Sequence, residues 1–321
     1  MRRWCLLLVL KCLYLLGHSD SPELRFAVLA DWGGLPVPPY HTLHQAAVAA
    51  ELQRLSQGPG LDFILSLGDH FYFNGVRDVE DPRFKHTFES VYYQHPLVDV
   101  PWYLVSGNHD HRGNVSAQIQ YSSVSRRWNY PSQYYSLHFP VPGSNVSLCV
   151  LMVDTVVLCG NTWDKEQPVG PENHEKAQQH WEWIQTTLQH TRAEYVLVAG
   201  HYPVWSIGHH GSTSCLLDRL RPLLEKYKVS AYVSGHDHNL QFIRDGAGVA
   251  YVVSGNGAIN DVDSSHRNSV PQEWQRFSSP VNQTKGGVAY FQLRPDLMTV
   301  SYVQTDGKCV YQAELSSRRR E

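Results

Sequence analysis

The stretch Phe63-Ile64-Leu65-Ser66-Leu67-Gly68-Asp69-His70-Phe71-Tyr72 joins an apolar run to a carboxylate, a histidine and a phenol. The apolar run predicts a buried strand, so Asp69 stands at a strand end and Tyr72 lies three residues beyond it. A carboxylate can bridge two cations, and a phenolate is a hard, strongly donating ligand that suits a ferric ion. We therefore interpret Asp69 as the bridge of a two-metal site and Tyr72 as the ligand that marks one metal as iron. The other ligands should come from the ends of other strands.

Six further apolar, β-rich runs precede polar or glycine-containing motifs in the same way. They cover residues 25–30, 102–106, 148–153, 195–199, 231–234 and 249–253. Helical patterns lie between several of them, over His41–Gln57, His174–His190 and Cys215–Tyr227. This alternation predicts an α/β layered fold, in which polar groups at strand C-termini converge on one edge. Residues 287–293, 298–303 and 309–312 instead predict antiparallel strands joined by short turns.

Five motifs near these strand ends carry candidate metal ligands. They are Asp31 in Asp-Trp-Gly, Asp69 with Tyr72, Asn108 in Gly-Asn-His-Asp, His201 after Val-Ala-Gly, and His236 with His238 in Gly-His-Asp-His. A single motif of this kind is weak, because an Asp-x-Gly is usually a turn. Glycine before Asp69, Asn108 and His236 is expected to permit a sharp turn past each strand. Together the motifs predict one site whose hard and borderline ligands suit Fe, Mn or Zn.

The composition limits the classes of partner that the chain is expected to bind. Its 321 residues carry a net charge of −3 with histidine neutral, which gives no electrostatic case for nucleic acid or an anionic membrane. Its 18 histidines favour metal or proton chemistry. The length allows one large domain or two small ones, and a single layered domain fits it.

The N-terminus predicts secretion. A basic start, an apolar stretch to Leu16 and a polar turn make residues 1–20 typical of a cleaved signal peptide. No other segment approaches about 20 continuous apolar residues, so no transmembrane helix is expected. Asn114, Asn145 and Asn282 each begin an Asn-x-Ser/Thr triplet and are candidate glycosylation sites.

Four cysteines follow the predicted signal peptide, and four cysteines allow three pairings. Cys159 and Cys215 lie in polar, glycine-rich segments and are the favoured pair in an oxidising compartment. Cys149 lies in an apolar run, where a buried free thiol is the simpler interpretation. The pairing of Cys149 with Cys309 is left open.

The order D-x-G, G-D-x-x-Y, G-N-H-D, V-x-x-H, G-H-x-H resembles that of the purple acid phosphatases within the metallophosphoesterases. The likeness runs over nearly the whole mature chain, and its short length is similar to that of vertebrate members. The resemblance implies a four-layer αββα sandwich of two mixed sheets flanked by helices. Residues 21–321 would then form a single calcineurin-like domain. Serine/threonine phosphatases carry Asp-Arg-Gly where this chain has Phe71-Tyr72-Phe73.

The resemblance also implies a role for each site residue. The ferric site would be held by Asp31, Asp69, Tyr72 and His238, and the divalent site by Asp69, Asn108, His201 and His236. His109 and His210 match outer-shell histidines near the phosphate, and Cys159 and Cys215 match the family's disulfide. The enzyme would hold two iron ions per subunit, or iron with zinc or manganese. It would act as a monomer, secreted or lysosomal, and residues 163–173 lie where relatives carry a protease-sensitive loop.

The implied reaction is hydrolysis of phosphate monoesters, on phosphoproteins, nucleotides or small phosphates. A metal-bound hydroxide would attack phosphorus in line while two cations neutralise the phosphate. At acidic pH, His109 or His210 would be cationic and could donate to the leaving oxygen, and Asp110 would orient a histidine. Three alternatives stay open on the same residues: a phosphodiesterase or nucleotide hydrolase, a redox role for the iron, and a non-catalytic glycoprotein. The last usually lacks a ligand, whereas every expected ligand is present here.

Overall fold

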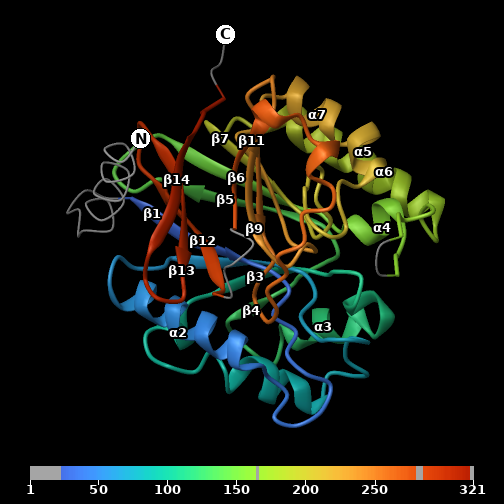
Figure 1. The fold of residues 1–321 in the computed structure, drawn as a ribbon, viewed down its shortest axis with the longest axis vertical. Coiled ribbons are helices and arrows are strands. Elements are labelled where there is room, and N and C mark those ends of the chain that lie inside the picture. The colour runs from blue at the N-terminus through green and yellow to red at the C-terminus, as the bar shows by residue number, and fades with distance from the viewer. Residues whose placement is uncertain (1–22, 164–165, 280–284, 319–321) are drawn as a thin grey trace.

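The computed structural model describes residues 23–163, 166–279 and 285–318, and Figure 1 shows its layers. Two seven-stranded sheets lie against each other in this part of the chain, with helices on the outer side of each. The four-layer α/β sandwich expected from the sequence is therefore confirmed. The predicted signal peptide, residues 1–20, lies outside the described residues.

The first sheet has the strand order β14-β13-β12-β1-β2-β3-β4. Its strands are β1 (Leu24–Leu29), β2 (Phe63–Leu67), β3 (Trp102–Val105), β4 (Trp128–Asn129), β12 (Gly287–Leu293), β13 (Met298–Gln304) and β14 (Cys309–Leu315). β1 to β4 run parallel, and the C-terminal strands pair antiparallel as predicted. All five residues of β2 are buried, because both faces of this central strand are covered.

The second sheet has the strand order β11-β9-β10-β8-β7-β6-β5. Its strands are β5 (Tyr135–Pro140), β6 (Ser147–Met152), β7 (Tyr195–Ala199), β8 (Ala231–Ser234), β9 (Leu240–Arg244), β10 (Ala250–Ser254) and β11 (Gln275–Ser278). The central strands β6, β7, β8 and β10 are parallel, whereas β5, β9 and β11 pair antiparallel. The sequence patterns had predicted the central strands and had missed β4, β5, β9 and β11.

The α-helices are α2 (Leu43–Gln57), α3 (Val115–Tyr121), α4 (Thr155–Cys159), α5 (His174–His190), α6 (Ser214–Arg219) and α7 (Arg221–Lys226). A π-helical turn, Phe84–Glu89, and short 3₁₀ turns at Leu97–Asp99, Asp110–Arg112, Arg267–Ser269 and Gln272–Trp274 complete the described elements. Asn173 caps α5 by accepting a hydrogen bond from the amide of Lys176, and the helix has the predicted bounds.

The prediction of one helix over Cys215–Tyr227 is wrong, because the segment forms α6 and α7. Pro222 stands in the first turn of α7 and lacks the amide hydrogen that a continuous helix would need. The break falls at Leu220, which stays buried. The apolar spacing therefore predicted the buried face correctly, but it did not predict the break between the two helices.

Three hydrophobic clusters fill the spaces between the four layers. Alternate residues of β1 divide between two of them: Phe26 and Val28 pack between the sheets, and Ala27 and Leu29 pack toward α2. The third cluster joins the second sheet to α5, α6 and α7. Figure 1 shows α2 and α3 on one side of the sheets and α4 to α7 on the other. This packing fixes the strand ends that carry the predicted ligands.

Candidate metal centre

The predicted ligands lie where strand ends from both sheets face one another. Asp31, Asp69 and Asn108 follow β1, β2 and β3 of the first sheet, and His201 and His236 follow β7 and β8 of the second. All five are almost fully buried. The fold thus brings together motifs that are far apart in the chain, as expected for parallel strand ends in an α/β fold.

One group of ligand atoms gathers around the phenol of Tyr72. Its hydroxyl lies 3.2 Å from Oδ1 of Asp31 and 3.0 Å from Nε2 of His238. The histidine nitrogen lies 3.6 Å from the same carboxylate oxygen. Atoms that bind one ion at about 2.1 Å lie about 3 to 3.5 Å apart, so these three atoms are spaced to share one metal.

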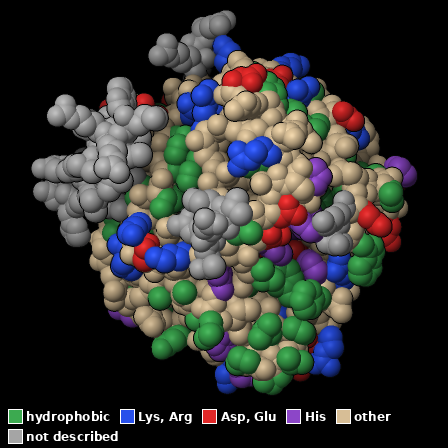
Figure 2. All heavy atoms as spheres, in the orientation of Figure 1, with side chains coloured by type: hydrophobic (Ala, Val, Ile, Leu, Met, Phe, Trp, Pro, Cys, Tyr) green, Lys and Arg blue, Asp and Glu red, His purple; other side chains and the backbone are tan. Residues whose placement is uncertain are grey.

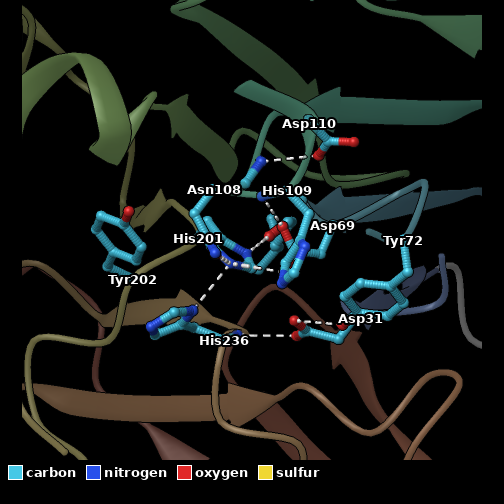
Figure 3. A network of polar contacts seen from close by, with 12 residues as sticks. Asp31, Asp69, Tyr72, Asn108, His109, Asp110, His201, Tyr202 and His236 are labelled. Carbon is cyan, nitrogen blue, oxygen red and sulfur yellow. Dashed lines mark hydrogen bonds and ion pairs between the residues drawn. The ribbon is translucent and has the colours of Figure 1, made fainter. Parts of the chain in front are cut away.

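A second group gathers around His201. Its Nε2 lies 3.0 Å from Oδ1 of Asn108, 3.2 Å from Nδ1 of His236 and 3.5 Å from Oδ2 of Asp69. Asp69, His201 and His236 each offer a ligand atom within 4.8 Å of the others. Figure 3 shows the carboxylate of Asp69 between these histidines and the side chain of Tyr72. Asp69 is therefore placed where both groups can use it.

The protonation of His201 shows that the second group fits a cation. Its Nδ1 lies 2.8 Å from the carbonyl oxygen of Leu67, which only accepts, so Nδ1 carries the hydrogen. Burial lowers the pKa of His201, so the ring is neutral and Nε2 presents a lone pair. That lone pair faces an amide oxygen of Asn108 and a carboxylate oxygen of Asp69. Lone pairs that converge on one point are satisfied by a metal ion.

The electrostatics of the first group fit a cation equally well. Burial and the neighbouring carboxylate of Asp69 raise the pKa of Asp31 well above its usual range, while burial and Asp31 raise the pKa of Tyr72. Burial opposes ionisation of Asp69 too, but attraction to His201 and His109, together with a hydrogen bond from the amide of His109, outweighs it and lowers the pKa of Asp69. Burial and the nearby His210 lower the pKa of His238 to about 4. A cation would favour ionised Asp31 and Tyr72 and would bind neutral His238.

Three of the predicted ligands occupy the left-handed backbone region, which the sequence did not reveal. The φ angles are 60° at Asp31, 53° at Asp69 and 69° at His236. Such a conformation costs on the order of 1 to 3 kcal/mol per non-glycine residue, although aspartate and histidine tolerate it better than most. The turn past each strand is therefore made by the ligand itself, and the packed sheets hold it there.

The glycines before the ligands act differently from the prediction. Gly68 has a φ of 92° and does supply conformational freedom. Gly107 and Gly235 lie outside the left-handed region, so that interpretation is wrong for both. A Cβ on Gly107 would lie 2.3 Å from Oδ1 of Asp69, and one on Gly235 would lie 2.4 Å from Oδ2 of Asp31. These two glycines leave room for the carboxylates.

His109 and His210 both border the ligands. Nε2 of His109 lies 3.8 Å from Oδ2 of Asp69, and its Nδ1 donates to the carbonyl of Phe73 at 2.7 Å. The ring of His210 stacks on that of His236 with centroids 4.1 Å apart. The adjacent His209 turns instead toward an acidic loop, where its Nδ1 lies 3.0 Å from Asp263.

Buried carboxylates hold the loops in place. Asp110 accepts hydrogen bonds from the amides of His70 at 3.1 Å and Gly107 at 2.9 Å, so it ties together the loops after β2 and β3. The sequence had assigned it to orienting a histidine; its closest imidazole is that of the buried His70, at 3.6 Å. Asp237 similarly accepts from the amide of His210 at 2.8 Å and fixes that loop.

Arg83 is a supporting residue that the sequence reading missed. Its guanidinium is buried and donates to the carbonyls of Tyr72 and Gly33, so it joins the ligand loops after β1 and β2. Burial lowers its pKa to about 10, which leaves it cationic at neutral pH. No motif surrounds Arg83, and the sequence carries no signal that would have found it.

The cysteines and sequons lie away from these ligands. The structure contains the Cys159–Cys215 disulfide, with Cα atoms 5.8 Å apart, and Cys149 is a buried free thiol. Cys149 is therefore not paired with Cys309. Asn114 and Asn145 are exposed, and Asn282 lies outside the described residues. Across the described ranges, every helix is too short or too polar to cross a bilayer.

Comparison with known proteins shows which families the chain resembles. The family model for calcineurin-like phosphoesterases matches residues 24–240. Human tartrate-resistant acid phosphatase type 5 is 48% identical over 324 residues, which cover 100% of both chains. Purple acid phosphatase 7 of Arabidopsis thaliana is 30% identical and covers 75% of this chain and 71% of its own. Among solved structures, GAP50, the anchor in the inner membrane complex of Plasmodium, has a TM-score of 0.80 at 25% identity and covers 94% of this chain and 91% of its own.

Proposed function

The chain belongs to the calcineurin-like phosphoesterases and, within them, to the purple acid phosphatases, and from this premise we propose that it hydrolyses phosphate monoesters at a binuclear Fe(III)–M(II) centre. The second metal would be iron, zinc or manganese. The observation that carries the proposal is the position of Asp69 between two groups of ligand atoms. Each group supplies the ligands of one ion, and Asp69 is available to both.

We propose that Asp31, Asp69, Tyr72 and His238 hold the ferric ion, and that Asp69, Asn108, His201 and His236 hold the divalent ion. When bound, the pair would neutralise the phosphate and supply hydroxide for in-line attack at acidic pH. Tyr72 is the ligand that selects iron, since a phenolate is a hard donor. Its deprotonation needs such a cation, because burial and Asp31 otherwise raise its pKa.

His109 and His210, which both border the candidate ligands, are proposed to act on the substrate. His109 uses Nδ1 to hold the carbonyl of Phe73, which leaves Nε2 on the side of Asp69. In the cationic form it can donate a proton to the leaving oxygen. His210 packs on His236 and would donate to a phosphate oxygen. Both groups therefore act at the oxygens of the ester.

We further propose that the chain is a secreted or lysosomal monomer. The basic and apolar start of the sequence supports cleavage of residues 1–20, which leaves residues 21–321 as one domain. The exposed positions of Asn114 and Asn145, and the Cys159–Cys215 disulfide, suit an oxidising, glycosylating compartment.

The test is metal content and the visible spectrum of the purified protein, alongside its turnover of p-nitrophenyl phosphate and the bis-ester. We expect two metals, an absorption band from Tyr72 to iron, and faster turnover of the monoester. Asp69→Asn should lose metal and activity, and Tyr72→Phe should lose the band. Tyr251→Phe, a buried tyrosine on β10, is the matched control. A band that survives Tyr72→Phe, or a colourless, fully active iron-free protein, would disprove the iron assignment.

A further inference from the structure

A buried histidine that the proposed centre does not use lies directly after Asp69. His70 is fully buried, and the rings of Trp32 and Trp128 pack against it with centroids 5.1 Å and 5.5 Å from its own. Figure 2 shows histidine side chains on the surface of one face of the molecule, whereas His70 contributes to no surface. Both of its ring nitrogens have hydrogen-bond partners, which offsets the cost of burying them.

These partners fix the position of the hydrogen on the ring. The amide of Gly68 donates to Nε2 of His70 at 3.2 Å, so Nε2 presents a lone pair. The hydrogen therefore lies on Nδ1, which donates to Oε1 of Gln118 at 2.9 Å. The other end of that side chain agrees with this direction, because its Nε2 donates to Oδ1 of Asp110 at 2.9 Å. Each donor thus points toward the carboxylate of Asp110.

The amide that binds His70 belongs to the peptide group that binds a candidate metal ligand. The N–H of Gly68 and the carbonyl of Leu67 form one peptide bond, and this carbonyl accepts from Nδ1 of His201 at 2.8 Å. Four hydrogen bonds therefore form one head-to-tail relay, in the order His201, the Leu67–Gly68 peptide, His70, Gln118 and Asp110. Figure 3 shows His201 and Asp110, the two ends of the relay. Its four side chains are fully buried.

The common direction of the donors gives the relay an effect on metal binding. Aligned hydrogen bonds polarise one another, and the low dielectric of the interior strengthens this effect. The negative end at Asp110 therefore favours electron density on Nε2 of His201. This is the atom that faces Asn108 and Asp69 in the second group of ligand atoms. An imidazole whose other nitrogen donates strongly is a more basic metal ligand.

We propose that His70 and Gln118 are positioning residues for the divalent ion, which act by relaying the charge of Asp110 to His201. The proposal rests on the binuclear centre proposed above and names the residues that set the affinity of its second site. Tyr72, in the first group of ligand atoms, is not a member of the relay. Loss of the relay should therefore weaken one metal site and leave the other unchanged.

The variant Gln118→Met tests the relay, because it removes both hydrogen bonds of this side chain and retains those of Gly68 and His201. We expect the Kd of zinc, measured by chelator competition on protein that retains iron, to rise about 10-fold, the lower end of the range for such partners. The visible band assigned to Tyr72 should remain. Gln45→Met, at an equally buried glutamine of α2, is the matched control and should change neither. Wild-type zinc affinity in Gln118→Met, or equal loss of zinc and of the band, would show that Gln118 only supports the fold.

A double variant distinguishes a relay from two independent contacts. Because both residues act in one series, His70→Leu combined with Gln118→Met should weaken zinc binding no more than His70→Leu alone. Effects that multiply would overturn the proposal. A further test needs no variant: nitrogen NMR of the iron-free, zinc-loaded wild type should place the ring hydrogen of His70 on Nδ1. A hydrogen on Nε2 would interrupt the relay and refute it.

The same measurements separate the relay from the proposed function. Zinc binding that depends on Gln118, in a protein that hydrolyses neither p-nitrophenyl phosphate nor its bis-ester, would refute the phosphatase function alone. Hydrolysis with unchanged zinc affinity in Gln118→Met would refute the relay alone. A wild type that binds no zinc or other divalent ion would refute both.

Discussion

The stability of this fold toward acid should depend on one histidine in α5. His180 is fully buried and stacks on Tyr134 with ring centroids 4.1 Å apart. Neither of its ring nitrogens has a hydrogen-bond partner among the described residues. Burial therefore lowers its pKa from about 6.5 to about 4, and attraction to Asp154 offsets only part of the effect.

The sign and size of the effect follow from proton linkage. Above pH 6.5 the ring is neutral in both states. Between pH 6.5 and about 4, only the unfolded chain binds the proton, so stability falls as the pH falls. At pH 5 the loss is about 1.5 pH units times 1.36 kcal/mol, or about 2 kcal/mol. Below about pH 4 both states are protonated and the loss stops growing.

The variant His180→Leu removes the titrating group and keeps an apolar side chain of similar volume. When the pH falls from 7 to 5, the wild type should lose about 2 kcal/mol of unfolding free energy through His180, and the variant should not. The unfolding free energy of the variant minus that of the wild type should therefore rise by about 2 kcal/mol. Urea unfolding at the two pH values, with the disulfide intact, measures this difference independently of any change in packing. His190→Leu, at the exposed end of the same helix, is the matched control. Equal pH dependence in wild type and His180→Leu would show that the reasoning about burial is wrong.

Three further outcomes are expected at the centre and the disulfide. Gly107→Ala would place a methyl group 2.3 Å from Oδ1 of Asp69, so metal content and activity should fall sharply. The control Gly246→Ala, whose methyl group would have no neighbouring atom nearer than 3.9 Å, should retain both. Full metal content in Gly107→Ala would contradict the close approach. Cys159→Ala should lower the unfolding free energy by about 4 kcal/mol, because the disulfide to Cys215 closes a loop with a sequence separation of 56. An unchanged midpoint of urea unfolding would contradict this prediction. Dialysis against a chelator should lower the unfolding temperature, because an ion whose free concentration is about 100 times its Kd stabilises the folded state by about 2.7 kcal/mol. An unchanged unfolding temperature would count against bound metal.

The sequence alone determined the layers and the ligand types. Apolar runs such as Phe63–Leu67 are long enough only for strands, and the polar residues after them could be identified without coordinates. The helix His174–His190 was predictable because its apolar spacing, cap and length agree. Short strands without such runs, including Leu240–Arg244, were missed because their pairing is decided by neighbours distant in the chain.

Only the tertiary structure decided how close the candidate ligands lie to one another and which residues support them. The left-handed backbone at Asp69 is held by packing that a local motif does not encode. Arg83 reaches the loops of Tyr72 and Gly33 from a segment with no motif. The physical reason is that ligand identity is a property of single residues, whereas distance, burial and charge balance arise when separate strand ends are packed together.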